Sequence, residues 1–95
     1  MTSYIVDFSK VKTMYELHQL LKDSFYFPDY YGMNMDAFGD CITWDIDIPA
    51  TIYISGIDRL PKDLCSAKEK LKEILNRAVK WYEKIGMELN VVYDD

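Results

Sequence analysis

The order of strand-like and helix-like segments is the feature that most constrains the fold of this 95-residue chain. Residues 4–8, 51–54 and 89–93 are short runs rich in β-branched and aromatic residues, which predicts three strands. Segments of helical periodicity separate these runs. Strands alternating with helices favour a parallel sheet in an α/β layer, because parallel neighbours need a crossover connection. We expect a single domain over residues 1–95, with one face of the small sheet only partly covered.

The first helix has a clear start signal. Thr13 followed by Glu16 is a capping-box pattern, and Pro28 is expected to stop the helix. Apolar residues recur at helical spacing between these points and predict a buried stripe. The stripe consists of Met14, Leu17, Leu21 and Phe25.

Two further helices are predicted. Asn34 is a plausible N-cap for a helix that runs to about Thr43. Ser66 with Glu69 is a second capping-box pattern, which begins the longest helix, and Gly86 closes it. The connector at residues 56–63 has room for one helical turn. The inward positions of the longest helix are Leu71, Ile74, Leu75, Ala78, Tyr82 and Ile85.

Charge is unevenly distributed along the chain. The net charge is −5 at pH 7, and residues 23–58 contain no Lys, Arg or His, whereas the last helix is rich in Lys and Arg. An acidic protein is a poor partner for nucleic acid, because phosphates require cations. A basic protein partner is compatible with this charge, and electrostatic attraction would speed encounter. We expect the free protein to be monomeric, since an acidic patch repels its own copy.

The second predicted helix has an acidic face. Asp36 and Asp40 lie one turn apart on the same side, where like charges disfavour a helix, and Gly39 between them costs about 1 kcal/mol relative to Ala. Departures from local stability of this kind are typical of functional sites. The opposite side is predicted to be buried. It carries Met35, Ala37, Phe38, Cys41 and Ile42.

This acidic face has two interpretations. It can be ordinary solvated surface, as most acidic helix faces are. Its lack of local cations and its aromatic neighbours Tyr30, Tyr31 and Trp44 favour a protein interface instead.

Other chemistry is weakly represented. Cys41 and Cys65 are expected to stay reduced, Cys41 as a core residue, and no Cys/His spacing indicates a metal or cofactor. His18, the only histidine, is expected at the surface or edge of the first helix. The N-terminus lacks a secretory signal pattern and no apolar run is long enough to span a membrane, so we expect a cytoplasmic protein.

Residues 28–41, PDYYGMNMDAFGDC, closely resemble the loop and second helix of the barstar family, inhibitors of the bacterial ribonuclease barnase. Leu17, His18 and Pro49 also fit, and the resemblance covers essentially the whole chain. It implies a three-stranded parallel sheet packed against helices, no catalytic activity, and a basic secreted ribonuclease of barnase type as partner. Asp40 would mimic a substrate phosphate at the centre of the interface. The positions that match family contacts are Tyr30, Asn34, Asp36 and Asp40, with Met35, Gly39, Thr43, Trp44 and Asp45 as neighbours.

The sequence departs from the family pattern around this face. Gly39 stands where barstar has Trp, and Trp44 and Asp45 stand where it has Gly followed by Trp. The family also has an acidic contact residue on its last helix. The corresponding position here is Trp81, with Glu83 nearby, so the resemblance does not imply that contact for this chain. The redistributed aromatic surface leads us to expect that the partner's surface differs too.

Two alternatives remain beside the inhibitor hypothesis. A protein-binding module of the same fold could regulate a different basic protein or toxin, which the changed rim around Gly39 and Trp44 would suit. An enzyme with Asp36 and Asp40 as paired carboxylates is disfavoured, because both are predicted on a solvated helix face and not in a cleft.

Overall fold

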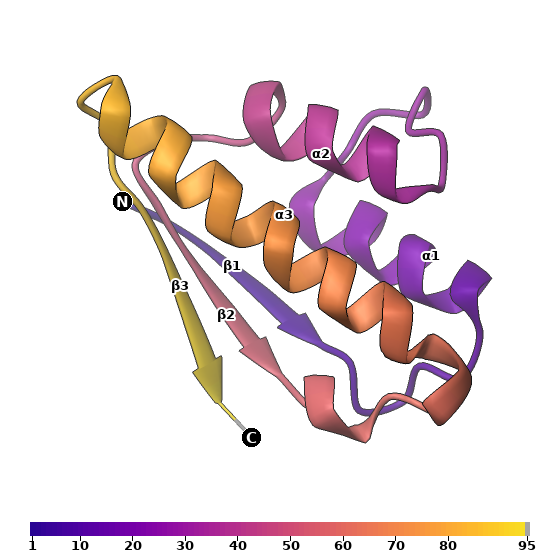
Figure 1. Ribbon diagram of the computed structural model, residues 1–95. Helices are drawn as coiled ribbons and strands as arrows, with labels where there is room; N and C mark the ends of the chain where they lie inside the picture. The colour runs from indigo at the N-terminus through magenta and orange to yellow at the C-terminus, as the bar shows by residue number, and fades with distance from the viewer. Residues whose placement is uncertain (95) are drawn as a thin grey trace.

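The computed structural model describes residues 1–94 and contains one three-stranded sheet and three α-helices. The elements follow in the order β1, α1, α2, β2, α3 and β3, with two short 3₁₀ turns between β2 and α3 (Figure 1). Their bounds are Thr2–Asp7 (β1), Met14–Phe25 (α1), Met35–Trp44 (α2), Ala50–Ser55 (β2), Cys65–Lys84 (α3) and Leu89–Asp94 (β3), with 3₁₀ turns at Ile57–Arg59 and Lys62–Leu64. The predicted α/β class with a parallel sheet is confirmed.

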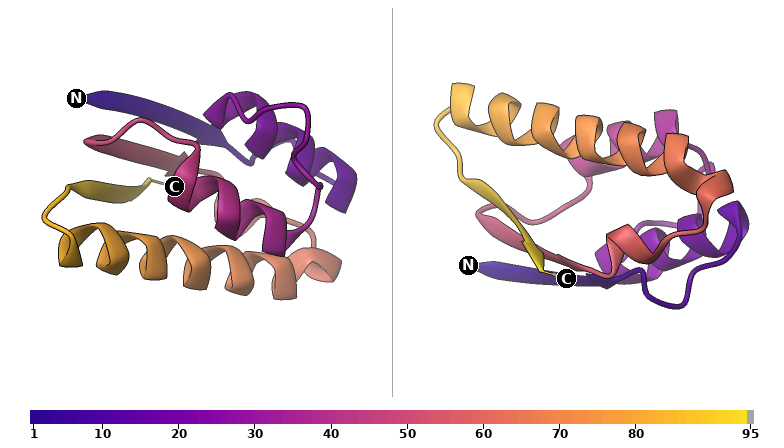
Figure 2. Two further views of the ribbon diagram at one scale, coloured as in Figure 1. Left: turned by 90° about the horizontal axis from the view of Figure 1, so that it is seen from above. Right: turned by 60° about the horizontal axis from the view of Figure 1, so that its bottom comes forward.

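The sheet is fully parallel, in the order β1-β2-β3. Both crossovers step the same way across the sheet, and right-handed crossovers then place all helices on one face (Figure 2). The other face is open. Ile5, Tyr53 and Val92 lie side by side on it in register and are 71%, 44% and 43% exposed. The prediction of an incompletely covered sheet is therefore correct.

The core lies between the sheet and the helices. Its largest fully buried side chains include Phe8, Phe25 and Phe38, which come from the end of β1, from α1 and from α2. The rings of Phe25 and Phe38 lie 6.0 Å apart, so α1 and α2 pack against each other within this core. None of the helices within residues 1–94 is both long and apolar enough to cross a membrane.

Most predicted helix ends agree with the structure. Thr13 forms the capping box with Glu16 at the start of α1, and Asn34 caps α2. Gly86 follows α3 with φ of +80°, as expected for a glycine that closes a helix. The connector at residues 56–63 contains more helical structure than expected, because a second 3₁₀ turn starts within it.

Two predicted helix signals were wrong. The helix α1 ends at Phe25, where Tyr26 takes the left-handed conformation and donates its N–H to the Lys22 carbonyl, so the helix stops before it reaches Pro28. Ser66 does not cap α3. The helix begins at Cys65, directly from a 3₁₀ turn, and its N-cap residue makes no side-chain hydrogen bond.

Three burial predictions were also wrong. Met14, in the first turn of α1, is 43% exposed, and Ile85, just past the end of α3, is 49% exposed. His18 was expected at the surface but is only 2% exposed. It lies on the same inward stripe as Leu17 and Leu21.

The connection after β2 depends on a glycine. Gly56 has φ of +70°, and a Cβ at this position would lie 2.7 Å from the Ser9 backbone nitrogen. Gly86 has φ of +80° but has open space around its Cα. The two glycines therefore share the left-handed backbone conformation, but only Gly56 lies close to the backbone of another segment.

We expect Gly56→Ala to lower the free energy of unfolding more than Gly86→Ala does. The left-handed conformation costs an L-residue about 1–2 kcal/mol at either site, and only Gly56→Ala adds a clash with backbone. Urea unfolding of both variants measures the difference. Equal decreases in the free energy of unfolding would contradict a close contact between Gly56 and Ser9.

Candidate functional site

The helix α2 separates an apolar face from an acidic face, as predicted. Phe38, Cys41 and Ile42 are at most 3% exposed and pack into the core. Asp36 and Asp40 are exposed on the outer side. Because the apolar stripe fixes the rotation of the helix, the two carboxylates have no route to the interior.

Asn34 has a local structural role at the start of α2. Its Oδ1 accepts the Ala37 N–H at 2.8 Å, and its Nδ2 donates to the Gly32 carbonyl at 3.1 Å. The preceding Met33 has φ of +55°. The side chain thus ties the loop to the helix and remains exposed.

The loop before α2 is anchored by a buried polar pair. Phe27 and Tyr31 are each 5% exposed and their rings lie 5.0 Å apart. The Tyr31 hydroxyl lies 2.7 Å from Nδ1 of His18. Burial lowers the pKa of His18 and raises the pKa of Tyr31. A neutral imidazole and a protonated phenol therefore share this hydrogen bond, and the loop is held to α1.

The same loop presents Tyr30 beside the far end of α2. Tyr30 is 72% exposed, and its hydroxyl donates to Oδ1 of Asp45 at 2.9 Å. This hydrogen bond raises the pKa of Tyr30 above its usual value. This hydrogen bond joins two predicted contact residues that are fifteen positions apart in the sequence.

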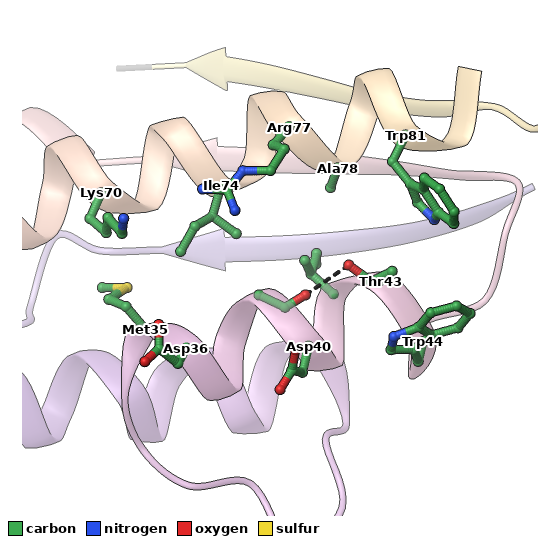
Figure 3. Close-up of a pocket in the computed structure, with 12 residues that line it drawn as sticks. Met35, Asp36, Asp40, Thr43, Trp44, Lys70, Ile74, Arg77, Ala78 and Trp81 are labelled. Carbon is green, nitrogen blue, oxygen red and sulfur yellow. Dashed lines mark hydrogen bonds between the residues drawn. The ribbon is translucent and has the colours of Figure 1, made fainter. Parts of the chain in front are cut away.

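Hollows flank α2 on both sides. A groove of about 540 Å³ separates it from α3, and a second hollow of about 520 Å³ separates it from the loop. Asp40 and Trp44 border both. The helix is thus a ridge that presents Asp40 near its crest. Figure 3 shows Asp40 directed away from α3, whereas Ile74 points from α3 toward α2.

The predicted contact residues lie together on this ridge and beside its two hollows. Thr43 also borders the groove, where its hydroxyl donates to the Gly39 carbonyl at 2.8 Å. Met35 lies at the N-terminal end of the groove and Trp44 at the other (Figure 3). All nine predicted positions border one of the two hollows or cap α2, namely Tyr30, Asn34, Met35, Asp36, Gly39, Asp40, Thr43, Trp44 and Asp45.

Sequence reasoning missed the contribution of α3 to the groove. Lys70, Ile74, Arg77 and Trp81 follow one another at spacings of four, three and four residues, which places them on one face of a helix. That spacing is the signal that would have identified them. Trp81 lies edge-on to Trp44, with ring centroids 6.3 Å apart.

The cations of α3 do not neutralise the acids of α2. Lys70 and Arg77 both approach Oε1 of Glu73, at 3.8 Å and 3.3 Å. Within residues 1–94 no salt bridge joins Asp36 or Asp40 to either cation. The two carboxylates of the acidic ridge are therefore not paired with these cations.

The geometry does not support catalysis by this face. Asp36 and Asp40 lie on an exposed helix side and not inside a closed cleft. The nearby thiol of Cys41 is buried, which raises its pKa to about 11, so it is not a thiolate nucleophile at neutral pH. Cys65 is exposed at the start of α3 and lines neither of the two hollows beside α2.

Comparison with known proteins identifies the class of protein that this fold and acidic ridge define. Residues 1–94 match the family described as "Barstar (barnase inhibitor)". The chain is also 35% identical over 78 residues to the Bacillus subtilis (strain 168) protein named "Putative ribonuclease inhibitor YrdF", which covers 82% of this chain and 86% of that protein. This chain belongs to the barstar family.

The buried His18 makes a pH dependence of stability testable. Its pKa is lowered in the folded state, so the unfolded chain binds more protons below about pH 6.5 and stability falls as the pH falls. We expect the free energy of unfolding to decrease between pH 7.5 and pH 5.5. Urea unfolding at these pH values measures it.

The control is His18→Gln, which keeps a hydrogen-bonding group beside Tyr31 and cannot titrate. Its stability is expected to change less than that of the wild type across the same pH range. The same slope in both proteins would rule out His18 as the cause.

Proposed function

We propose that this protein is a cytoplasmic, monomeric inhibitor of a basic extracellular ribonuclease of barnase type, and that it protects the cell that makes it. The observation that carries the proposal is the exposed pair Asp36 and Asp40 on α2, which no cation within residues 1–94 pairs with. Membership of the barstar family and the name of the Bacillus relative support the same role.

Asp40 is the central group in this mechanism. A ribonuclease active site offers cationic and hydrogen-bond-donating side chains to the substrate phosphate. A carboxylate near the crest of a ridge can enter such a site and accept two or more charge-assisted hydrogen bonds from Arg or His. The active site is then blocked because its phosphate-binding groups are occupied. Asp36, one turn earlier, adds negative charge toward the same surface.

The surface around Asp40 is ordered before the partner arrives. Tyr30 is tied to Asp45, and Asn34 is tied to the first turn of α2. Ordering side chains on binding costs free energy, so a surface whose groups are already fixed loses less on association. Met35, Gly39, Thr43 and Trp44 complete the contact surface along the groove side of the ridge.

A second candidate is a module that binds a basic protein other than a ribonuclease. The specific observation in its favour is the aromatic pair Trp44 and Trp81 beside the acidic ridge. Charge alone selects any basic partner, and exposed aromatic rings often decide among partners. Capture of ribonuclease alone from the source cell's secreted proteins would argue against this candidate.

Asp40→Ala is expected to weaken inhibition of barnase by at least about 30-fold, because loss of one member of a buried charge pair costs about 2 kcal/mol or more. The free-energy cost used here is based in part on charge pairs between barnase and barstar. The expected size of the effect therefore comes from the family. The measurement is the inhibition constant from steady-state RNA cleavage.

Asp63→Ala is the matched control, because it removes one exposed carboxylate from the 3₁₀ turn before α3, away from α2. It is expected to change the inhibition constant less than about 3-fold. A similar loss in the two variants would show that net charge, and not Asp40 itself, is responsible.

Association with barnase is also expected to slow as salt rises. Attraction between an acidic ridge and a basic cleft acts over about 10 Å at 0.1 M ionic strength and about 3 Å at 1 M. Stopped-flow measurement between 0.05 and 1 M NaCl is expected to show the association rate constant falling at least about tenfold, with a smaller change in dissociation. A salt-independent association rate would contradict electrostatic steering by this face.

A further inference from the structure

The groove between α2 and α3 has walls of opposite charge. Asp36 and Asp40 border it on the α2 side, and Lys70 and Arg77 border it on the α3 side (Figure 3). The two walls are held apart, and neither cation forms a salt bridge across the gap within the described chain. A partner that fills this groove meets both signs of charge within one small area.

The middle of the groove is apolar and open because of Gly39. A Cβ built on Gly39 would lie 3.9 Å from Cγ2 of Ile74, which is an ordinary contact distance. An alanine therefore fits, whereas a longer side chain would extend into the groove. Ile74 and Ala78, which are 5% and 4% exposed, form the apolar floor of the groove on the α3 side.

One end of the groove is formed by two tryptophans. Trp44 is 74% exposed and Trp81 is 38% exposed, and they lie edge to face. The chain has only these two tryptophans. Aromatic rings at the border of a charged surface are the side chains that most often anchor protein interfaces.

The α3 wall carries an excess of positive charge. The side chains of Lys70 and Arg77 are 48% and 67% exposed, and both share the single carboxylate of Glu73. Exposed ion pairs of this kind contribute little stability and exchange readily with other partners. Arg77 is thus available to a carboxylate of another protein, which it can bind in a bidentate manner.

We propose that this groove is a second recognition site, which receives an apolar side chain of the ribonuclease over Gly39 and a neighbouring carboxylate of the ribonuclease at Arg77. The inference rests on the proposed function and adds the chemistry of the target. The ribonuclease would be basic where it meets Asp40 and acidic beside that region. Because the groove requires an acidic surface next to the basic active site, it selects among ribonucleases that share a basic active site.

The test uses purified barnase and a panel of barnase variants, each with one residue around the active-site entrance replaced by Glu. Inhibition constants are measured with the wild-type inhibitor, with Arg77→Glu and with Arg59→Glu. Arg59→Glu makes the same charge change at an exposed residue in the first 3₁₀ turn, outside the groove. At least one barnase variant is expected to be inhibited tenfold or more tightly than its parent, and Arg77→Glu alone is expected to abolish that gain.

Two further measurements test the apolar part of the site. Gly39→Leu is expected to weaken inhibition at least tenfold by filling the groove, and Gly39→Ala less than threefold. With 5-fluorotryptophan in the inhibitor and unlabelled barnase, the ¹⁹F resonances of Trp44 and Trp81 are both expected to shift on saturation. Trp44→Phe and Trp81→Phe assign the two resonances.

The outcomes separate this inference from the proposed function. If barnase is inhibited but Arg77→Glu behaves like Arg59→Glu and the Trp81 resonance does not move, the groove is not a recognition site, although the inhibitor function stands. If neither barnase nor any variant is inhibited at micromolar concentration, the proposed function is overturned and the groove inference falls with it.

Discussion

The hydroxyl of Tyr82 donates to the carbonyl oxygens of Ile42 and Thr43 at the end of α2, and the position of the binding surface depends on this contact. The last turn of a helix leaves carbonyls without partners inside the helix, and burying them unpaired is costly. Tyr82 lies on α3 and is 5% exposed, so the bond forms only when the two helices are side by side. Burial raises the pKa of its phenol, which therefore remains a donor. Both walls of the groove are fixed by this pairing.

The other end of α2 is fixed by different chemistry. His18 and Tyr31 hold the preceding loop to α1, while Phe27 stacks on Phe25 and meets the edge of Phe38. The loop therefore has a buried aromatic side, although it presents Tyr30 to solvent. Rigid anchoring on the inside supports the hydrogen bonds that Tyr30 and Asn34 make on the outside. This arrangement explains how a surface loop can be preorganised for a partner.

The sequence predicted the elements better than it predicted their contacts. Helix starts at Thr13 and Asn34 depend on residues within one turn, so local patterns identify them. The failure at Ser66 has the opposite cause, since the 3₁₀ turn before α3 continues into the helix and leaves no free N-cap position. The burial of His18 depends on Tyr31, thirteen residues away, and no periodicity indicates that a histidine has a buried partner. The acidic face of α2 was found from sequence because all its residues belong to one helix.

The groove was not found because its walls come from two different helices, whose lining residues are at least 26 positions apart in the sequence. In sequence, the acidic middle and the basic last helix look like separate regions that could occupy opposite sides of the molecule. The fold brings them together along α2 and α3. Opposite charges at that proximity would neutralise one another if they paired across the gap, and the ridge would lose its attraction for a basic partner. Glu73 reaches both Lys70 and Arg77 along the axis of α3. Glu73 thus pairs with the cations on their own helix, and within residues 1–94 no salt bridge crosses the groove from these cations to Asp36 or Asp40.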